Sequence, residues 1–131
     1  MAIPCIDMNK NCIFCDIEHE RVLAENELCF AIRDRFPVSD GHTLIIPKRH
    51  VSNYFDLTDD EVMAMQAMMK AQKEQLDTEL SPDGYNIGIN VSEAAGQTVF
   101  HVHMHLIPRY KGDVENPRGG VRGVIPSKQK Y

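Results

Sequence analysis

Three histidines stand at alternate positions in the stretch 99–107: His101, His103 and His105. Apolar residues occupy the positions that follow each of them: Val102, Met104 and Leu106. Strict alternation is typical of a strand with one buried face, and side chains two positions apart on a strand point the same way. The sequence therefore predicts a strand over 99–107 with three imidazoles on one face. Pro108 is expected to end it, because proline cannot donate a ladder hydrogen bond.

The clustered imidazoles restrict the chemistry of that face. Three neighbouring rings repel one another as cations, which favours the neutral form. A neutral imidazole can be a nucleophile, a general base or a metal ligand. The pattern therefore indicates either phosphoryl-type chemistry on a nucleophilic histidine or a three-histidine metal site. A chance run of surface histidines is the third interpretation, and the apolar opposite face argues against it.

Length and composition indicate one soluble globular domain. The chain has 131 residues, 43% apolar and 25% charged, and we expect residues 1–131 to form a single domain with an arm at 1–11 and a tail at 112–131. The sequence shows no apolar run of membrane-spanning length and no secretory signal, which predicts a cytoplasmic protein with reduced cysteines and no membrane partner. A net charge of −5 argues against nucleic acid as a partner.

The remaining patterns predict several strands and one long helix. Apolar runs at 27–32, 42–47 and 85–91 indicate strands, and a short strand is expected at 121–125. With the histidine strand, they predict an antiparallel sheet of about five strands, in which 85–91 pairs with the histidine strand and brings Asn90 close to it. Thr58 and Glu61 form a capping box that starts one long helix, expected to end near Glu79.

Cys12 and Cys15 are three positions apart and can therefore bind one metal ion together. Two cysteines are only half of a structural zinc site, so a buried pair of thiols is the equal alternative. A thioredoxin-like redox role is disfavoured, because no βαβ pattern surrounds the motif.

Polar residues outside the histidine strand suggest a site for an anion. Cations flank the strand ends and lie in the tail: Lys48, Arg49, Arg109, Lys111, Arg118 and Arg122. They predict a local basic mouth that attracts phosphate, with solvated strand-end charges as the alternative. Gln97, Thr98 and the backbone around Gly96 can supply neutral donors to an oxyanion.

The stretch 101–107, together with "HTLIIPKRH" and "AAGQTV", resembles the motif of the histidine-triad (HIT) superfamily, and the resemblance runs from about Cys12 to Pro108. The resemblance implies a HIT-like α+β fold with a short N-terminal helix, and a homodimer with joined sheets. It also implies a nucleotidyl hydrolase or transferase that acts on a small nucleotide, with adenosine or another purine as the base.

The resemblance also implies roles for individual residues. His103 is the nucleophile that forms a nucleotidyl-histidine intermediate, and His105 contacts the phosphate. Asp34 holds the ribose hydroxyls, and His42 orients the triad. A phosphate-binding and leaving-group set comprises Asn90, Gly96, Gln97 and Thr98.

A branch of the superfamily with an N-terminal C-x-x-C is similar to this chain, which implies a structural Zn²⁺ on Cys12, Cys15, His50 and His101. Other motifs point to different substrates. The stretch 107–113 resembles the fragile-histidine-triad branch, which cleaves dinucleoside polyphosphates, whereas Asn90 resembles the Hint branch, which cleaves nucleoside phosphoramidates. The tail 118–122 resembles bacterial-type members and could bind a longer leaving group.

Two other functions stay open from the sequence. The chain could be a non-enzymatic nucleotide-binding or regulatory HIT module that keeps the pocket for sensing. Less favoured is a three-histidine zinc hydrolase that uses metal-bound hydroxide.

Overall fold

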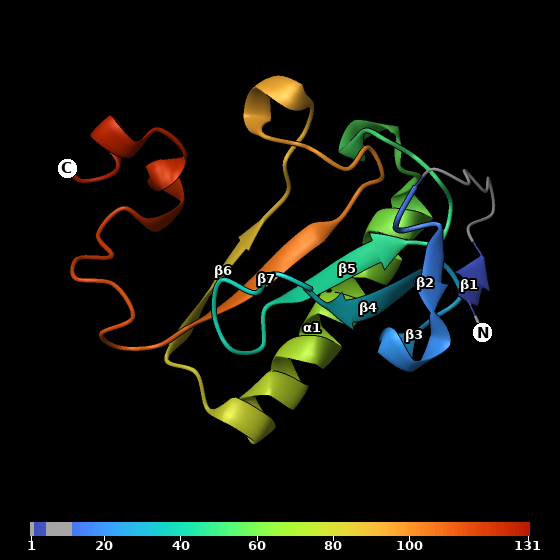
Figure 1. The fold of residues 1–131 in the computed structure, drawn as a ribbon, viewed down its shortest axis with the longest axis horizontal. Helices are drawn as coiled ribbons and strands as arrows, with labels where there is room; N and C mark the ends of the chain where they lie inside the picture. Colours follow the sequence, from blue (N-terminus) through green and yellow to red (C-terminus); the bar gives the residue numbers. More distant parts are fainter. Residues whose placement is uncertain (1, 5–11) are drawn as a thin grey trace.

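The computed structural model describes residues 2–4 and 12–131 and shows a five-stranded antiparallel sheet with one long helix (Figure 1). The strands are β1 (Ala2–Pro4), β2 (Asp16–Glu18), β3 (Val22–Glu25), β4 (Cys29–Arg33), β5 (Thr43–Pro47), β6 (Gly84–Gly88) and β7 (Met104–Arg109), and the helix is α1 (Asp59–Leu80). The large sheet has the order β3-β4-β5-β7-β6, and β1 pairs separately with β2. The predicted α+β class and five-stranded sheet are confirmed.

Both faces of the sheet are covered at its centre, which explains why β4 and β5 are almost wholly buried. On one face α1 packs against β4, β5 and β7, and its Met65, Met69 and Leu76 meet Ile45 and Leu106. The other face carries a second apolar cluster that includes the N-terminal turn: Cys12, Phe14, Cys15, Ile17, Phe30, Ile32, Leu44 and Ile46. The histidine-bearing side of β7 lies on this second face, because His105 pairs with Leu44.

Helix α1 begins at the predicted capping box. The Glu61 backbone N–H donates to the Thr58 hydroxyl at 3.1 Å, and the Thr58 N–H donates to the Glu61 carboxylate at 2.9 Å. Arg49 donates to both oxygens of the same carboxylate, at 2.8 and 3.1 Å. The helix ends at Leu80, one residue beyond the expected position, and Ser81 turns the chain with a φ of 49°. No helix in the described ranges is long and apolar enough to cross a membrane.

The histidine strand is shorter than predicted and displaced toward the C-terminus. It begins only at Met104, so His101 lies in a bend and His103 in irregular chain before it. The Val102 N–H donates to the Val51 carbonyl at 2.8 Å, outside the sheet. Pro108 does not end the strand. The ladder to β5 stops at Leu106, and proline is tolerated where pairing continues on one side only, here with β6.

The two ends of the chain also differ from expectation. The strand predicted at 121–125 is not formed. The chain there makes the 3₁₀ helix η4 (Gly120–Val124), and Gly119 and Gly120 before and at its start both take positive φ, which a strand does not allow. The N-terminal helix is reduced to a turn at 12–15 and the 3₁₀ helix η1 (His19–Arg21). Of the predicted arm 1–11, only β1 is described, and residues 1 and 5–11 lie outside the described residues.

Three more 3₁₀ helices occupy the connections and the tail: η2 (Tyr54–Asp56), η3 (Glu93–Ala95) and η5 (Pro126–Lys128). The C-terminal tail folds beyond β6, at the opposite end of the sheet from β1 and β2 (Figure 1). There Arg118 and Arg122 stack on the Tyr131 ring, with guanidinium carbons 4.9 and 4.7 Å from its centre.

Gly41, in the loop between β4 and β5, gives a test of the packing beside α1. It has a φ of 88°, and an added Cβ would lie 2.7 Å from Leu76 Cδ2. Gly112 has a similar φ of 84° but nothing within 4 Å. Gly112→Ala is expected to cost about 1 kcal/mol of unfolding free energy through backbone strain alone. Gly41→Ala is expected to cost about 1–3 kcal/mol more through overpacking. Equal losses in urea unfolding would contradict the packing described.

Candidate active site and metal centre

A cavity of about 720 Å³ opens on the sheet face opposite α1. It is bounded by the N-terminal turn, the loop after β4 and the segment that leads into β7. Seven of the residues predicted for catalysis or nucleotide binding line it, together with Cys12 of the predicted metal site: Asp34, His42, Asn90, Gly96, Thr98, His103 and His105. Apolar residues also line the cavity and are called its apolar wall below: Ile13, Phe14, Ile17, Phe36, Val38, Leu44 and Val99. The cavity therefore combines polar groups at the histidines with an apolar wall, as sites for small organic ligands commonly do.

The tautomer of His103 follows from its backbone partner. His103 Nδ1 lies 2.9 Å from the carbonyl oxygen of His101. A carbonyl oxygen can only accept, so Nδ1 carries the proton. In a neutral ring the Nε2 atom then bears the lone pair, and the ring lines the cavity. His103 thus presents a basic nitrogen to any ligand held there.

His105 has the opposite tautomer, which is set by a relay of three groups. The Val38 backbone N–H donates to His42 Nδ1 at 3.2 Å, so the proton of a neutral His42 lies on Nε2. His42 Nε2 is 2.9 Å from His105 Nδ1, which must therefore accept. The proton of His105 lies on Nε2. The site thus pairs a nucleophilic nitrogen on His103 with a hydrogen-bond donor on His105.

Burial keeps the relay neutral. Desolvation lowers the pKa of His105 to about 4, and repulsion from His103 and His42 adds to this effect. Desolvation also lowers the pKa of His42, although Asp34 opposes the shift. The Asp34 carboxylate lies 3.5 Å from His42 Nε2 and accepts from the Phe36 N–H at 2.8 Å. Asp34 is thereby fixed at the cavity wall with capacity to accept further hydrogen bonds.

A second cluster lies behind the cavity and contains the four residues that the resemblance implied for zinc. Their ligand atoms all lie within 4.8 Å of one another: Cys12 Sγ, Cys15 Sγ, His50 Nδ1 and His101 Nδ1. His101 Nδ1 is 3.5 Å from each sulfur, and His50 Nδ1 is 3.1 Å from Cys15 Sγ and 3.2 Å from His101 Nδ1. Ligand atoms around one tetrahedral Zn²⁺ lie about 3.3–3.8 Å apart, so the four residues fit the ion.

The chemistry of this donor set also fits a metal. His101 Nε2 donates to the Pro47 carbonyl at 2.8 Å, which directs the Nδ1 lone pair toward the sulfurs. Burial raises the pKa of the Cys12 thiol, so thiolates in this cluster need a cation nearby. Two thiolates and two imidazoles fill all four tetrahedral positions, which is the composition of a structural zinc site.

The three-histidine metal site is not formed. Among residues 2–4 and 12–131, the metal-ligating side chains make two groups, and His103 belongs to neither. His101 is in the cysteine cluster, whereas His105 is in a group with Asp34 and His42. In that second group the Nε2 of His42 carries a proton, because Val38 donates to the other nitrogen. The group is therefore built for hydrogen bonding rather than for a metal ion.

Two of the predicted phosphate-binding residues, Gln97 and Gly96, have polar groups that already form hydrogen bonds within the protein. Gln97 is 3% exposed and does not line the cavity. Its side chain accepts from the Ser92 N–H at 2.8 Å and donates to the Ser52 and Val99 carbonyls. The Gly96 N–H donates to Glu93 at 2.9 Å, and its φ of 93° accounts for the glycine. Gln97 and Gly96 therefore shape the loop that places Thr98 at the cavity.

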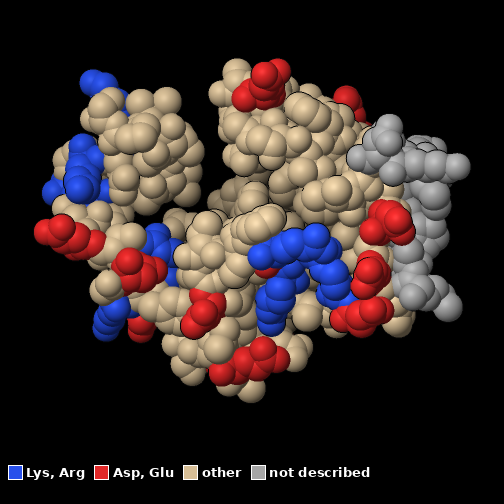
Figure 2. Space-filling view, viewed as in Figure 1, with Lys and Arg blue, Asp and Glu red and all other residues tan. Residues whose placement is uncertain are grey.

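The basic mouth predicted from the sequence is not formed. None of its six cations lines the cavity, and three of them pair with acids: Lys48 with Glu25, Arg49 with Glu61, and Arg109 with Asp113. Figure 2 likewise shows acidic side chains beside basic ones on the face that it presents. The arginines that do line the cavity are Arg21 and Arg35, to which the sequence pattern assigned no role.

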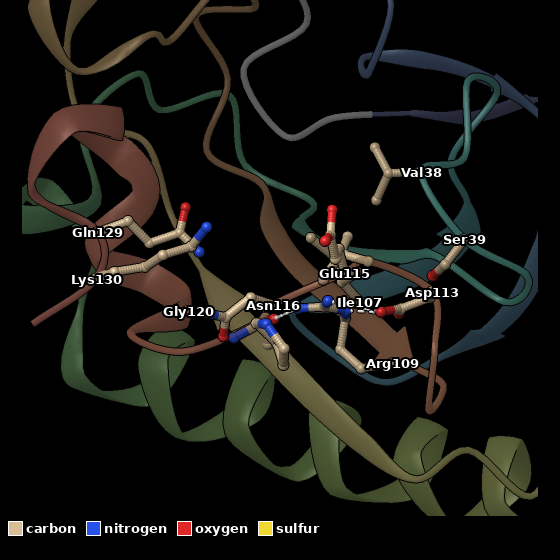
Figure 3. A pocket seen from close by; sticks show the side chains of 13 residues that line it. Val38, Ser39, Ile107, Arg109, Asp113, Glu115, Asn116, Gly120, Gln129 and Lys130 are labelled. Atoms are coloured by element: carbon tan, nitrogen blue, oxygen red, sulfur yellow. Dashed lines mark hydrogen bonds and ion pairs between the residues drawn. The ribbon is translucent and has the colours of Figure 1, made fainter.

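Arg109 belongs to a separate cavity of about 480 Å³ between β7 and the tail (Figure 3). Its guanidinium donates to Asn86 at 2.6 Å and to both oxygens of Asp113 at 2.8 Å. Ile107 and Arg109 border this cavity on one side, and Gln129 and Lys130 on the other. Arg118 and Arg122 are absent from its lining.

Phe14 and Val38 are site residues that the sequence pattern did not reveal. Phe14 lies between the two cysteines, and its ring packs near His103, with ring centres 5.0 Å apart. Val38 acts through its backbone N–H, which no side-chain pattern can indicate. The position of Phe14 inside the C-x-x-C motif was the one available signal for its role.

Comparison with known proteins finds one family. The HIT domain family model matches residues 17–112. The "Protein hit" of Bacillus subtilis is 44% identical over 112 residues, which cover 79% of this chain and 75% of that protein. The crystal structure of a HIT family protein from Bacillus anthracis superposes with a TM-score of 0.74 at 38% identity, and covers 79% of this chain and 77% of that one.

A zinc-bound histidine triad family protein from Mycobacterium smegmatis has a TM-score of 0.67 at 38% identity, over 72% of this chain and 69% of that one. Two relatives carry names of activities. Adenylylsulfatase HINT3 of Arabidopsis thaliana is 34% identical over 81% of this chain and 56% of its own length. AP-4-A phosphorylase of Mycobacterium tuberculosis is 33% identical over 73% of this chain and 50% of its own length. This chain thus spans about half the length of these two relatives.

Metal content tests the cysteine cluster. The purified protein is expected to hold about one zinc ion per chain, and Cys15→Ser or His50→Ala is expected to remove most of it. Cys29→Ala is the control, because Cys29 is a buried thiol in the other core cluster. His103→Ala is expected to retain zinc. Elemental analysis measures all four variants, and zinc loss that follows His103 instead of Cys15 would contradict this assignment.

Unfolding as a function of pH tests the neutral relay. A histidine with a pKa lowered from 6.5 to about 4 is neutral in the fold but protonated in the unfolded chain between these values. Unfolding then takes up a proton, so stability falls as pH falls from 6.5 toward 4. An asparagine at position 105 can still accept the hydrogen bond from His42. His105→Asn is therefore expected to reduce the proton uptake on unfolding near pH 5 by about one proton. The exposed His19, changed to Asn, is the control, and equal slopes would contradict the shift.

Proposed function

The chain belongs to the HIT family, and we propose that it is a nucleotidyl hydrolase or transferase that cleaves a nucleoside 5′-phosphoryl bond through a covalent intermediate on His103. One observation carries the proposal. The hydrogen bond of 2.9 Å from His103 Nδ1 to the His101 carbonyl leaves the Nε2 lone pair for a phosphorus atom in the cavity. The relatives with the names adenylylsulfatase and AP-4-A phosphorylase support the reaction class.

In the first step, His103 Nε2 attacks the α-phosphorus of the bound nucleotide. A P–N bond forms, the bond to the leaving group breaks, and its electron pair departs with the leaving group. The imidazole becomes cationic, because Nδ1 keeps its proton, and the His101 carbonyl dipole stabilises that charge. His105 donates its Nε2–H to a phosphoryl oxygen, and His42 holds this donor in place at 2.9 Å.

In the second step, water attacks the same phosphorus and breaks the P–N bond. The nucleoside monophosphate leaves, His103 returns to its neutral Nδ1–H form, and the proton of the water passes to solvent. Throughout both steps the substrate is held by groups around the reacting centre. Asp34 accepts hydrogen bonds from the ribose hydroxyls, the apolar wall packs on the base, and Asn90 and Thr98 contact the phosphate.

The zinc ion that Cys12, Cys15, His50 and His101 can hold has a structural role in this proposal. When bound, it crosslinks the N-terminal turn to the segments that carry His50 and His101. All protein groups that act on the substrate lie outside the four ligands.

The substrate is either a dinucleoside polyphosphate or a nucleoside phosphoramidate. Both substrates contain the same nucleotidyl group and differ in the leaving group. The attack by His103 acts on the nucleotidyl group that the two substrates share. The homodimer with joined sheets, the single domain over 1–131 and the cytoplasmic location stay predictions.

A substrate panel with mass detection tests this function. The protein is mixed with diadenosine polyphosphates, adenosine phosphoramidate and the guanosine analogues. Nucleoside monophosphate is expected from at least one class, with a nucleotidyl adduct on His103 in acid-quenched samples. His103→Ala is expected to lower kcat by about a thousandfold or more, because it removes the attacking atom. His19→Ala, an exposed histidine of η1, is the control.

Two outcomes would contradict the proposal. Equal rates for wild type and His103→Ala would exclude the covalent role. Binding of AMP by calorimetry with no product from any substrate would instead support the non-enzymatic nucleotide-binding module.

A further inference from the structure

Phe14 connects the metal centre to the proposed nucleophile. It lies in the turn between Cys12 and Cys15, which is closed by a hydrogen bond of 3.2 Å from the Cys15 N–H to the Cys12 carbonyl. Its side chain is 6% exposed and belongs to the same apolar cluster as both cysteines. The ring therefore has a fixed position relative to two of the four metal-ligating residues.

The Phe14 ring contacts two members of the triad. It meets the His103 ring with centres 5.0 Å apart and planes at 64°, and the His101 ring at 6.1 Å and 89°. Both geometries are edge-to-face, the arrangement in which aromatic rings attract one another. The His105 ring also packs near His103, with ring centres 5.2 Å apart. The ring of the proposed nucleophile thus contacts both Phe14 and His105.

A single hydrogen bond cannot fix an imidazole completely. The bond from Nδ1 to the His101 carbonyl sets one atom of His103, but the ring can still tilt about that contact. The Phe14 ring removes this freedom by packing against the His103 ring. Both restraints come from the metal centre, since His101 is one of its ligating residues and Phe14 lies between two others.

We propose that Phe14 is a positioning residue for His103, and that the metal centre orients the nucleophile through it. This inference rests on the proposed role of His103. Phe14 holds the Nε2 lone pair on the line of attack and keeps the Nδ1–H aligned with the His101 carbonyl, whose hydrogen bond fixes the tautomer. Its effect is on the nucleophile and is present before any substrate binds.

Phe14 also forms part of the apolar wall of the cavity, so its two roles must be separated. A wall residue contributes equally to the ground state and the transition state, and its loss raises KM. A positioning residue contributes to the attack, and its loss lowers kcat. Ile13 is the matched control, because it lies in the same turn and lines the same cavity but is 63% exposed.

The experiment compares Phe14→Ala, Phe14→Leu and Ile13→Ala in the metal-loaded protein. Phe14→Leu keeps an apolar side chain in the core and guards against a folding defect in Phe14→Ala. Zinc content is expected to stay at the wild-type level in all three. Both Phe14 variants are expected to lower kcat by about ten- to a hundredfold, the size expected for a misaligned reacting group, whereas Ile13→Ala acts on KM.

A second measurement does not depend on activity. Long-range ¹⁵N–¹H NMR spectra report the tautomer of each histidine ring, and the His103 signal is assigned by its loss in His103→Ala. Wild type is expected to show His103 as a single Nδ1–H tautomer. The Phe14 variants, and wild type stripped of metal by a chelator, are expected to show His103 nitrogen shifts averaged between tautomers.

The outcomes separate the two proposals. If His103→Ala is inactive while Phe14→Leu keeps the wild-type kcat and a single His103 tautomer, the positioning role is wrong and the proposed function stands. If His103→Ala is fully active, the proposed function itself fails. Unchanged His103 shifts after metal removal would overturn the link to the metal centre.

Discussion

The hydrogen bond from His103 Nδ1 to the His101 carbonyl is the interaction on which the rest of the site depends. A backbone acceptor cannot change its protonation state, so it fixes the tautomer of His103 more firmly than a titratable partner would. The carbonyl belongs to a residue whose own ring donates to Pro47 and faces two cysteines. The position of His103, the proposed nucleophile, therefore depends on a residue of the metal-ligating cluster.

The two faces of the sheet have different functions in the structure: one packs against α1, and the other carries the cavity. The α1 face holds most of the apolar core, and its capping box and the Arg49–Glu61 pair fix where the helix starts. The other face carries a smaller cluster, closed by the N-terminal turn, and its histidines stay partly accessible to the cavity. Packing against α1 stabilises the sheet, which leaves the second face free to place polar groups for a ligand.

The basic mouth is not formed, and Gln97 does not line the cavity, for one physical reason: these side chains have partners in the fold that the sequence does not show. Arg109 is used by Asp113 and Asn86, and Gln97 is used by three backbone groups. A buried polar group needs hydrogen-bond partners, and the fold supplies them from near and distant parts of the sequence. In contrast, the family resemblance named all four residues of the metal-ligating cluster, whereas the spacing of Cys12 and Cys15 alone left a buried thiol pair as an equal alternative.

The sequence by itself determined the main secondary-structure elements and named the candidate site residues. Its alternation and capping box predicted the sheet and the helix, because these depend on local periodicity. The residues that meet at the cavity were implied by the resemblance to the HIT superfamily. The tertiary structure alone decided the hydrogen-bond partners and the tautomers of the three histidines. Strand β7 begins only at Met104, so His101 turns to the cysteines, while His103 and His105 line the cavity with opposite tautomers. Those tautomers are set by the His101 carbonyl and the Val38 N–H, and a backbone partner brought close by folding leaves no mark in the pattern of side chains.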